Sequence, residues 1–114
     1  MLDHRESVEK AGIDIVHTEN GAVATLAGRI DIESSPNVRD QIIALLHTPN
    51  LRTLSIELSR VTHIDSSGVA TLIEALRIAR NCGTELRLQA LHGRSHRLFE
   101  ATGILSLFNE GIRR

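Results

Sequence analysis

The most informative stretch of the sequence is His63-Ile64-Asp65-Ser66-Ser67-Gly68, which joins a strand-like run to a helical pattern that extends from Val69 to Cys82. This order places two hydroxyl groups and a carboxylate at the N-terminus of a predicted helix. Unpaired backbone N–H groups and the positive end of the helix dipole favour negative charge at such a position. We therefore expect the helix to tolerate a phosphate group on one of these serines, while the surface around it changes.

Ordinary helix capping explains part of this pattern, because Asp and Ser are common capping residues. Asp65-Ser66-Ser67, however, offers more capping oxygens than one helix end requires. Gly68 lies inside the first turn, where glycine costs about 1 kcal/mol relative to alanine. The pattern therefore indicates a role beyond helix stability.

Turn residues and apolar periodicity predict strands that alternate with helices along the rest of the chain. Asn20-Gly21 favours the left-handed turn of a tight hairpin, so the first two strands should pair antiparallel. Ser34-Ser35-Pro36 is expected to supply a cap for the first helix followed by proline at its first position, and Pro49 is expected to stop that helix. The predicted strands span 13–18, 22–27, 53–58 and 85–89, and Ser95 and Gly103 bound a last helix that is followed by a short element at 104–108.

The long helix that starts at Ser67 has one apolar face, and Gly83 is placed for a left-handed turn at its C-terminal end. Cys82, just before that turn, is interpreted as a small buried thiol. Ile78 falls opposite the apolar face, and we keep it as a candidate contact for a partner. The predicted buried arc consists of Val69, Leu72, Ile73, Leu76 and Ala79.

These elements predict an α/β fold: a mixed four- to five-stranded sheet with an N-terminal antiparallel hairpin and helices packed against it. One domain is expected over residues 12–114, after an N-terminal segment of residues 1–11.

Composition argues against several function classes. The 13 Lys and Arg residues nearly balance the 14 Asp and Glu residues, and Trp and Tyr are absent, so neither a basic field nor stacking platforms for nucleic acid are present. No apolar run approaches the length of a membrane span, and Met1 to Lys10 lacks a signal-peptide pattern. We expect a cytoplasmic protein with no cofactor, no membrane insertion and no nucleic-acid partner.

Three motifs identify a family resemblance. Gly28-Arg29-Ile30-Asp31, Val61 to Val69, and Arg97-Leu98-Phe99 to Gly103-Ile104 together resemble the STAS domain, and more specifically the bacterial anti-sigma-factor antagonists. The resemblance implies that Ser66 is phosphorylated by a partner anti-sigma factor that is also a serine kinase. Asp65 and Asp31 match acids that flank the phosphorylation site, and Ser67 and Gly68 match the residues that start the helix and allow close approach.

The implied function is a binding switch without catalysis. The unmodified protein would sequester the anti-sigma factor, phosphorylation of Ser66 would block binding, and a phosphatase would reset the switch. Phosphoserine adds a charge of about −1.5 to −2, and like charges across an interface cost several kcal/mol. Loss of Ser66 as a helix cap would cost only about 1 kcal/mol, so the switch should act on binding and leave the fold intact.

A second reading within the same family stays open. Anti-sigma-factor antagonists often carry another glycine soon after the motif, where this chain has Ala70. The segment Ile73-Glu74-Ala75-Leu76 is also similar to STAS subunits of ABC-type lipid-transport complexes. In that case the partner would be a permease or ATPase subunit, and phosphorylation would not be required.

Other chemistries fit the residues less well. A serine hydrolase elbow would need glycine where Ile64 stands, with an acid–base pair to activate Ser66. A phosphoaspartate receiver would need a late lysine, whereas the only lysine is Lys10. His92, His96 and Glu100 have a spacing that could gather a metal ion, but the helix predicted from Ser95 starts too late to include His92. We therefore expect neither a catalytic nor a metal site.

Overall fold

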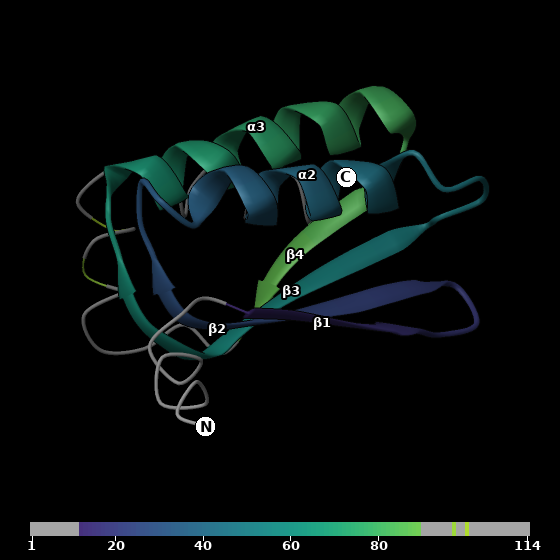
Figure 1. Ribbon diagram of the computed structural model, residues 1–114. Helices are drawn as coiled ribbons and strands as arrows, with labels where there is room; N and C mark the ends of the chain where they lie inside the picture. Colours follow the sequence, from purple (N-terminus) through teal and green to yellow (C-terminus); the bar gives the residue numbers. More distant parts are fainter. Residues whose placement is uncertain (1–11, 90–96, 98–99, 101–114) are drawn as a thin grey trace.

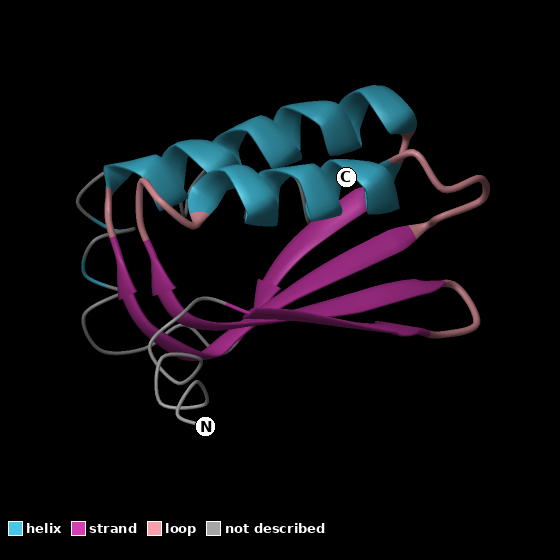
Figure 2. Cartoon of the chain, viewed as in Figure 1, coloured by secondary structure: helices cyan, strands magenta, loops and turns pink. Residues whose placement is uncertain are grey.

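The computed structural model describes residues 12–89, 97 and 100. Within them, strands and helices alternate in the predicted order, and two helices lie side by side over one face of a single sheet (Figures 1 and 2). The elements are β1 (Gly12–His17), β2 (Gly21–Ile30), α2 (Ser35–Leu46), β3 (Thr53–Ile64), α3 (Ser66–Cys82) and β4 (Glu85–Gln89).

The sheet confirms the predicted mixed α/β topology. Its four described strands are ordered β1-β2-β3-β4, with β1 antiparallel to β2 and the other two pairs parallel. Each parallel pair is joined by a helix, as a crossover connection requires. The helix predicted between Ser95 and Gly103, the element at 104–108 and the segment 1–11 lie outside the described residues, apart from Arg97 and Glu100.

Strands β2 and β3 are longer than predicted because they continue through two irregularities. The register between them shifts between Thr25 and Ala27 and again between Gly28 and Arg29, and Gly28 has a positive φ of 82°. Bulges of this kind increase the local twist and bend a strand. Both strands curve toward the helix layer at this end (Figure 1), so their ends reach the helix N-termini.

The hairpin between β1 and β2 forms as predicted, but the predicted left-handed Asn20-Gly21 turn is wrong, because neither residue has a positive φ. Gly21 is required for a different reason. A Cβ atom there would overlap the carbonyl group of Thr53 on the neighbouring strand. The Asn20 carbonyl oxygen accepts an N–H bond from Arg52 at 3.0 Å. Glycine therefore permits the close approach of β2 and β3.

The core lies between the sheet and the two helices. Burying one aliphatic side chain contributes about 1.5–3 kcal/mol, and the alternation of buried residues along β2 and β3 directs every second side chain toward the helices. The bidentate ion pair of Arg39 with Glu74, at 2.7 and 2.8 Å, ties α2 to α3 at the surface. The largest fully buried side chains are those of Leu26, Ile30, Val38, Ile42, Leu46, Leu54, Ile56, Leu72 and Leu86.

Candidate functional site

The ends of β2 and β3 bring the two predicted acidic residues to the same end of the sheet. Ile30 pairs with Ile64 across the parallel strands, and the backbone N–H of Asp65 donates to the carbonyl oxygen of Ile30 at 3.2 Å. Asp31 and Asp65 each follow one of these paired residues. Since neighbouring strands lie about 4.8 Å apart, the two loops that precede α2 and α3 adjoin each other (Figure 1).

The start of α3 is capped by Asp65. Its Oδ1 atom accepts N–H bonds from Ser67 at 2.9 Å and from Gly68 at 3.2 Å. The interpretation of Ser66 as a cap is therefore wrong, because Ser66 is the first residue of the helix. Two of the N–H groups expected to be free at this terminus are already occupied. A phosphate group on Ser66 would thus add its charge beside a carboxylate that already fills the cap.

Ser66 is the exposed residue of this motif. Its side chain is accessible and makes no hydrogen bond to any other residue that the structure describes, whereas Asp65 and Ser67 are half-buried. A kinase can reach such a hydroxyl group without unfolding the helix. Ser66, rather than Ser67, is therefore the accessible hydroxyl group at this helix start, and its phosphorylation stays a prediction.

Gly68 is buried where α3 crosses the two strand ends. A Cβ atom added there would lie 2.6 Å from Cγ1 of Ile64 and 2.9 Å from Cγ2 of Ile30. The glycine that weakens the helix therefore lets its first turn pack directly on the paired residues of β2 and β3. This close packing fixes the position of Ser66 relative to the Asp31 loop.

Asp31 is held by its own loop. Its Oδ1 atom accepts N–H bonds from Glu33 at 3.1 Å and from Ser34 at 3.2 Å. The bond from the Ser34 backbone, more than the ion pair with Arg29 at 3.7 Å, keeps the pKa of Asp31 below its ordinary value. Asp31 is therefore anionic near neutral pH, and its position is set before any partner binds.

Ser34 is the N-cap residue of α2, but its side chain makes no capping hydrogen bond, so the side-chain cap predicted from Ser34-Ser35 is wrong. Its hydroxyl group accepts an N–H bond from Asp31 at 2.9 Å and donates to the carbonyl oxygen of Arg29 at 2.8 Å. Ser34 therefore closes the loop instead of the helix. Ser35, the first residue of α2, is buried, and its hydroxyl group has no hydrogen-bond partner in the described part of the chain. Pro36 lies in the first turn of the helix, close to where it was predicted.

Sequence reasoning missed Ile32 in the same loop. Its side chain is 72% exposed, which is high for a large aliphatic residue. The available signal was an isoleucine between two acids, Asp31 and Glu33, in a segment predicted to leave the sheet. The loop after β2 therefore presents an apolar side chain with acids on both sides.

Two predictions about α3 are wrong. Ile78 is partly buried and packs against the core instead of lying opposite the buried face. It lies twelve residues along the helix from Ser66, about 18 Å at 1.5 Å per residue, so it does not join this site, and its contact with a partner stays a prediction. Cys82 is exposed rather than buried, whereas the left-handed turn at Gly83 is confirmed, with φ 77°.

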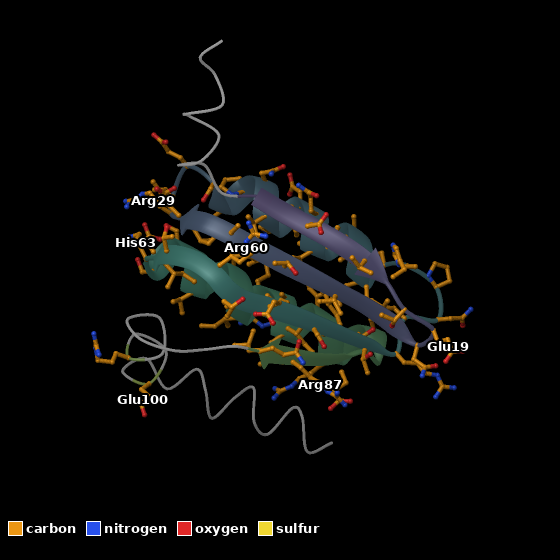
Figure 3. The ribbon with its side chains drawn as sticks, turned by 90° about the horizontal axis from the view of Figure 1, so that it is seen from below. Glu19, Arg29, Arg60, His63, Arg87 and Glu100 are labelled. Atoms are coloured by element: carbon orange, nitrogen blue, oxygen red, sulfur yellow. The ribbon has the colours of Figure 1, made fainter. Side chains whose placement is uncertain are left out.

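His63, the one histidine near Ser66 in sequence, lies on the other face of the sheet. It pairs with Arg29 beside the Ile30–Ile64 pair, whose side chains are buried beneath the helices. Figure 3, which views the molecule from below, shows Arg29, His63 and Arg60 gathered at this end and Glu19 at the opposite end. His63 is therefore not oriented to activate Ser66. His92 and His96, considered for a metal, lie outside the described residues.

The helices of the described segments are too short and polar to cross a membrane.

Comparisons with known proteins agree with this architecture. Residues 12–113 match the STAS domain family. An anti-sigma-B factor antagonist of Bacillus subtilis is 29% identical over 97 residues, which cover 85% of this chain and 87% of that protein. A protein of the same name from Listeria monocytogenes is 33% identical over 79 residues, which cover 69% of this chain and 68% of that protein.

Among solved structures, an anti-sigma factor antagonist from Mycobacterium paratuberculosis has a TM-score of 0.74 at 20% identity. The match covers 88% of this chain and 84% of that chain. This likeness shows the fold, and the sequence matches show the family. The chain belongs to the STAS-domain family, and its sequence relatives in that family are bacterial anti-sigma-factor antagonists.

Proposed function

We propose that this protein is a cytoplasmic anti-sigma-factor antagonist that binds an anti-sigma factor with serine-kinase activity and is switched off by phosphorylation of Ser66. The observation that carries the proposal is the exposed Ser66 hydroxyl group, next to the capping Asp65 and beside the Asp31 loop. The partner surface comprises Asp31, Asp65, Ser66 and Ser67, positioned by Gly68. A phosphatase returns the protein to its binding form.

The charge of this surface explains why a phosphate group would block binding. Asp31 and Asp65 already place two carboxylates at the ends of β2 and β3, and Glu33 is exposed in the same loop. A partner that complements these carboxylates presents basic or hydrogen-bond-donating groups to them. Phosphoserine adds about −1.5 to −2 of charge beside these carboxylates, without a free helix cap to receive it. The phosphate is repelled by the carboxylates of its own surface and is strongly hydrated, so burying it in the interface carries a large desolvation cost.

The same contacts explain why the fold would survive phosphorylation. Ser66 makes no hydrogen bond with the described residues, and its side chain is outside the core. The cap belongs to Asp65, which phosphorylation leaves covalently unchanged. Favourable interaction of the phosphate with the helix dipole, about 0.3–1 kcal/mol, opposes its repulsion by Asp65. The modification should therefore change the surface far more than the stability.

The test compares wild type with Ser66→Ala and Ser66→Asp in binding to the purified anti-sigma-type serine kinases of the source organism. Ser59→Asp is the matched control, because Ser59 is also exposed but lies in the middle of β3, away from the start of α3. We expect Ser66→Ala and Ser59→Asp to bind as wild type does, and Ser66→Asp to bind at least about 30-fold more weakly, which corresponds to about 2 kcal/mol.

Two results would overturn the proposal. Equal binding by Ser66→Ala and Ser66→Asp would remove the switch. The wild-type chain could also bind none of these kinases and instead recover a permease or ATPase subunit of a lipid-transport complex. That result would establish the function as a transporter subunit.

A further inference from the structure

Large exposed hydrophobic side chains occur at two positions among the described residues. Val16 is 55% exposed and Ile32 is 72% exposed. Val16 lies near the end of β1, close to the hairpin that carries Glu19, whereas Ile32 follows the end of β2 at the opposite end of the sheet, the end at which Figure 3 labels Arg29 and His63. A single exposed aliphatic residue needs no explanation. Exposure alone therefore does not indicate a binding surface, and the position of each residue has to be considered.

Ile32 stands in a loop whose backbone is fixed on both sides. The Asp31 carboxylate accepts the N–H groups of Glu33 and Ser34, and the Ser34 hydroxyl group ties the loop back to Arg29. Four bonds thus hold a four-residue segment while its apolar side chain remains in water. Such a preformed loop loses little conformational freedom on binding, which is how rigid contact residues gain affinity.

The surroundings of Ile32 indicate the chemistry of its binding partner. Asp31 and Glu33 flank it in sequence, and Asp31 is anionic near neutral pH. Asp65 and Ser66 form the adjoining start of α3, since the N–H of Asp65 bonds to the carbonyl oxygen of Ile30. The residues that carry most of the binding energy lie in well-packed, desolvated pockets near the centre of an interface, ringed by contacts that exclude water, and the rim around such an apolar centre is polar.

We propose that Ile32 inserts into an apolar pocket of the anti-sigma factor, and that basic groups around this pocket pair with Asp31 and Asp65. This inference rests on the proposed function and deepens it, because it assigns the binding energy to a side chain separate from the switch residue. Phosphorylation of Ser66 then acts on the rim of the pocket: it brings a dianion to a position that must lose water when Ile32 is buried.

The test measures the dissociation constant of the purified kinase for Ile32→Ala and Ile32→Asp, with Val16→Ala and Val16→Asp as matched controls. Truncation of an anchoring residue should weaken binding about 30-fold, and the aspartate variant should bind more weakly still. Both Val16 variants should stay within about threefold of wild type. Because Ile32 is exposed, its variants should keep the circular dichroism spectrum and unfolding midpoint of wild type.

A second measurement separates anchoring from the switch. Ile32→Ala should still be phosphorylated on Ser66 at saturating concentration, with a raised KM and an unchanged kcat, because the anchor contributes to binding and does not touch the transferred phosphoryl group. If wild type binds the kinase and Ser66→Asp does not, but both Ile32 variants bind as wild type does, the inference is overturned and the proposed function stands. If wild type itself does not bind, the proposed function and this inference fail together.

Discussion

The two described helices start at the same end of the sheet, and each has a serine as its first residue and an aspartate shortly before it. At α3, Asp65 is adjacent to the helix and caps it, so Ser66 is left exposed. At α2, Asp31 stands four residues before Ser35; its carboxylate closes the loop, and the Ser35 hydroxyl group is buried without a partner.

This difference shows that spacing decides the role of chemically equivalent residues. Three residues separate Asp31 from the first residue of α2, whereas none separates Asp65 from the first residue of α3. The longer connection moves the Asp31 carboxylate away from the helix N–H groups and leaves Ile32 exposed to solvent. The direct connection at α3 uses the carboxylate as a cap and presents a hydroxyl group instead. Under the proposed function, one helix start supplies a fixed contact surface, and the other supplies the group that is modified.

Among variants at the two helix starts, Gly68→Ala should have the largest effect on the free energy of unfolding, because it disrupts the close packing at the start of α3. The added methyl group meets Ile64, Ile30 and the Ile30 carbonyl oxygen within 3.0 Å. Overpacking of this kind costs about 1–3 kcal/mol. Because three atoms lie within 3.0 Å of the added carbon, we take the upper half of this range and subtract the gain in helix propensity of about 1 kcal/mol.

We expect urea unfolding to show a net loss of about 1–2 kcal/mol for Gly68→Ala. Gly12→Ala is the control, because nothing lies within 4 Å of its added Cβ atom, and it should change the free energy of unfolding by no more than about 0.5 kcal/mol. A Gly68→Ala protein as stable as wild type would show that the helix start is not closely packed.

Removal of the cap should have the next largest effect. Asp65→Ala loses the bonds from the backbone N–H groups of Ser67 and Gly68, and N-cap loss costs about 0.5–2 kcal/mol. Asp65→Asn keeps an oxygen acceptor at the same place and should recover most of that loss. The measurement is again urea unfolding, and equal stability of the alanine and asparagine variants would assign the effect to charge instead of capping.

The two first-position serines should respond in opposite ways to alanine. Ser35→Ala removes a buried hydroxyl group that lacks a partner among the described residues, so it should raise the free energy of unfolding by up to about 1 kcal/mol. Ser66→Ala should change it by less than about 0.5 kcal/mol, because its side chain is exposed. Thermal and urea unfolding of both variants test this, and destabilisation by Ser35→Ala would contradict the assignment of its hydroxyl group as unpaired.

The smallest predicted effect is the pH dependence that Asp31 confers. The folded protein lowers the pKa of Asp31 below the 3.8 of a free side chain, chiefly through the Ser34 backbone bond. Its contribution to stability is therefore present above pH 3.8 and is lost as the pH falls through the folded pKa. Wild type should be more stable than Asp31→Asn at pH 7, and the gap should close as the pH is lowered below 3.8; a gap that is constant with pH would contradict this origin.

Local patterns in the sequence predicted the elements well but not their ends. The alternation at Thr53 to Leu58 predicted β3, yet the strand continues to Ile64, because the bulges against β2 break the alternation without ending the strand. Asn20-Gly21 predicted the correct pairing for the wrong reason, since the need for glycine comes from Thr53, thirty-two residues later in the chain. Contacts between distant residues leave no local pattern.

Asp31 and the segment from Asp65 to Gly68 could be predicted as members of the candidate site, but the geometry of the site and the roles of Ile78 and Ile32 could not. Asp65 and Ser66 are both good capping residues, so sequence alone could not decide which one caps α3. Ile78 was misplaced because α3 packs on α2 as well as on the sheet, which widens its buried face. Ile32 was missed because its exposure depends on how the Asp31 carboxylate folds the loop, which only the structure shows.

The central claim is that the state of Ser66 controls binding and not folding. One pair of protein samples tests both parts of this claim. Protein phosphorylated stoichiometrically on Ser66 and unmodified protein are compared for kinase affinity by calorimetry and for stability by urea unfolding. We predict an affinity at least about 30-fold lower after phosphorylation, about 2 kcal/mol, with a change of less than about 1 kcal/mol in the free energy of unfolding. Unchanged affinity, or a loss of stability as large as the loss of binding energy, would contradict the account.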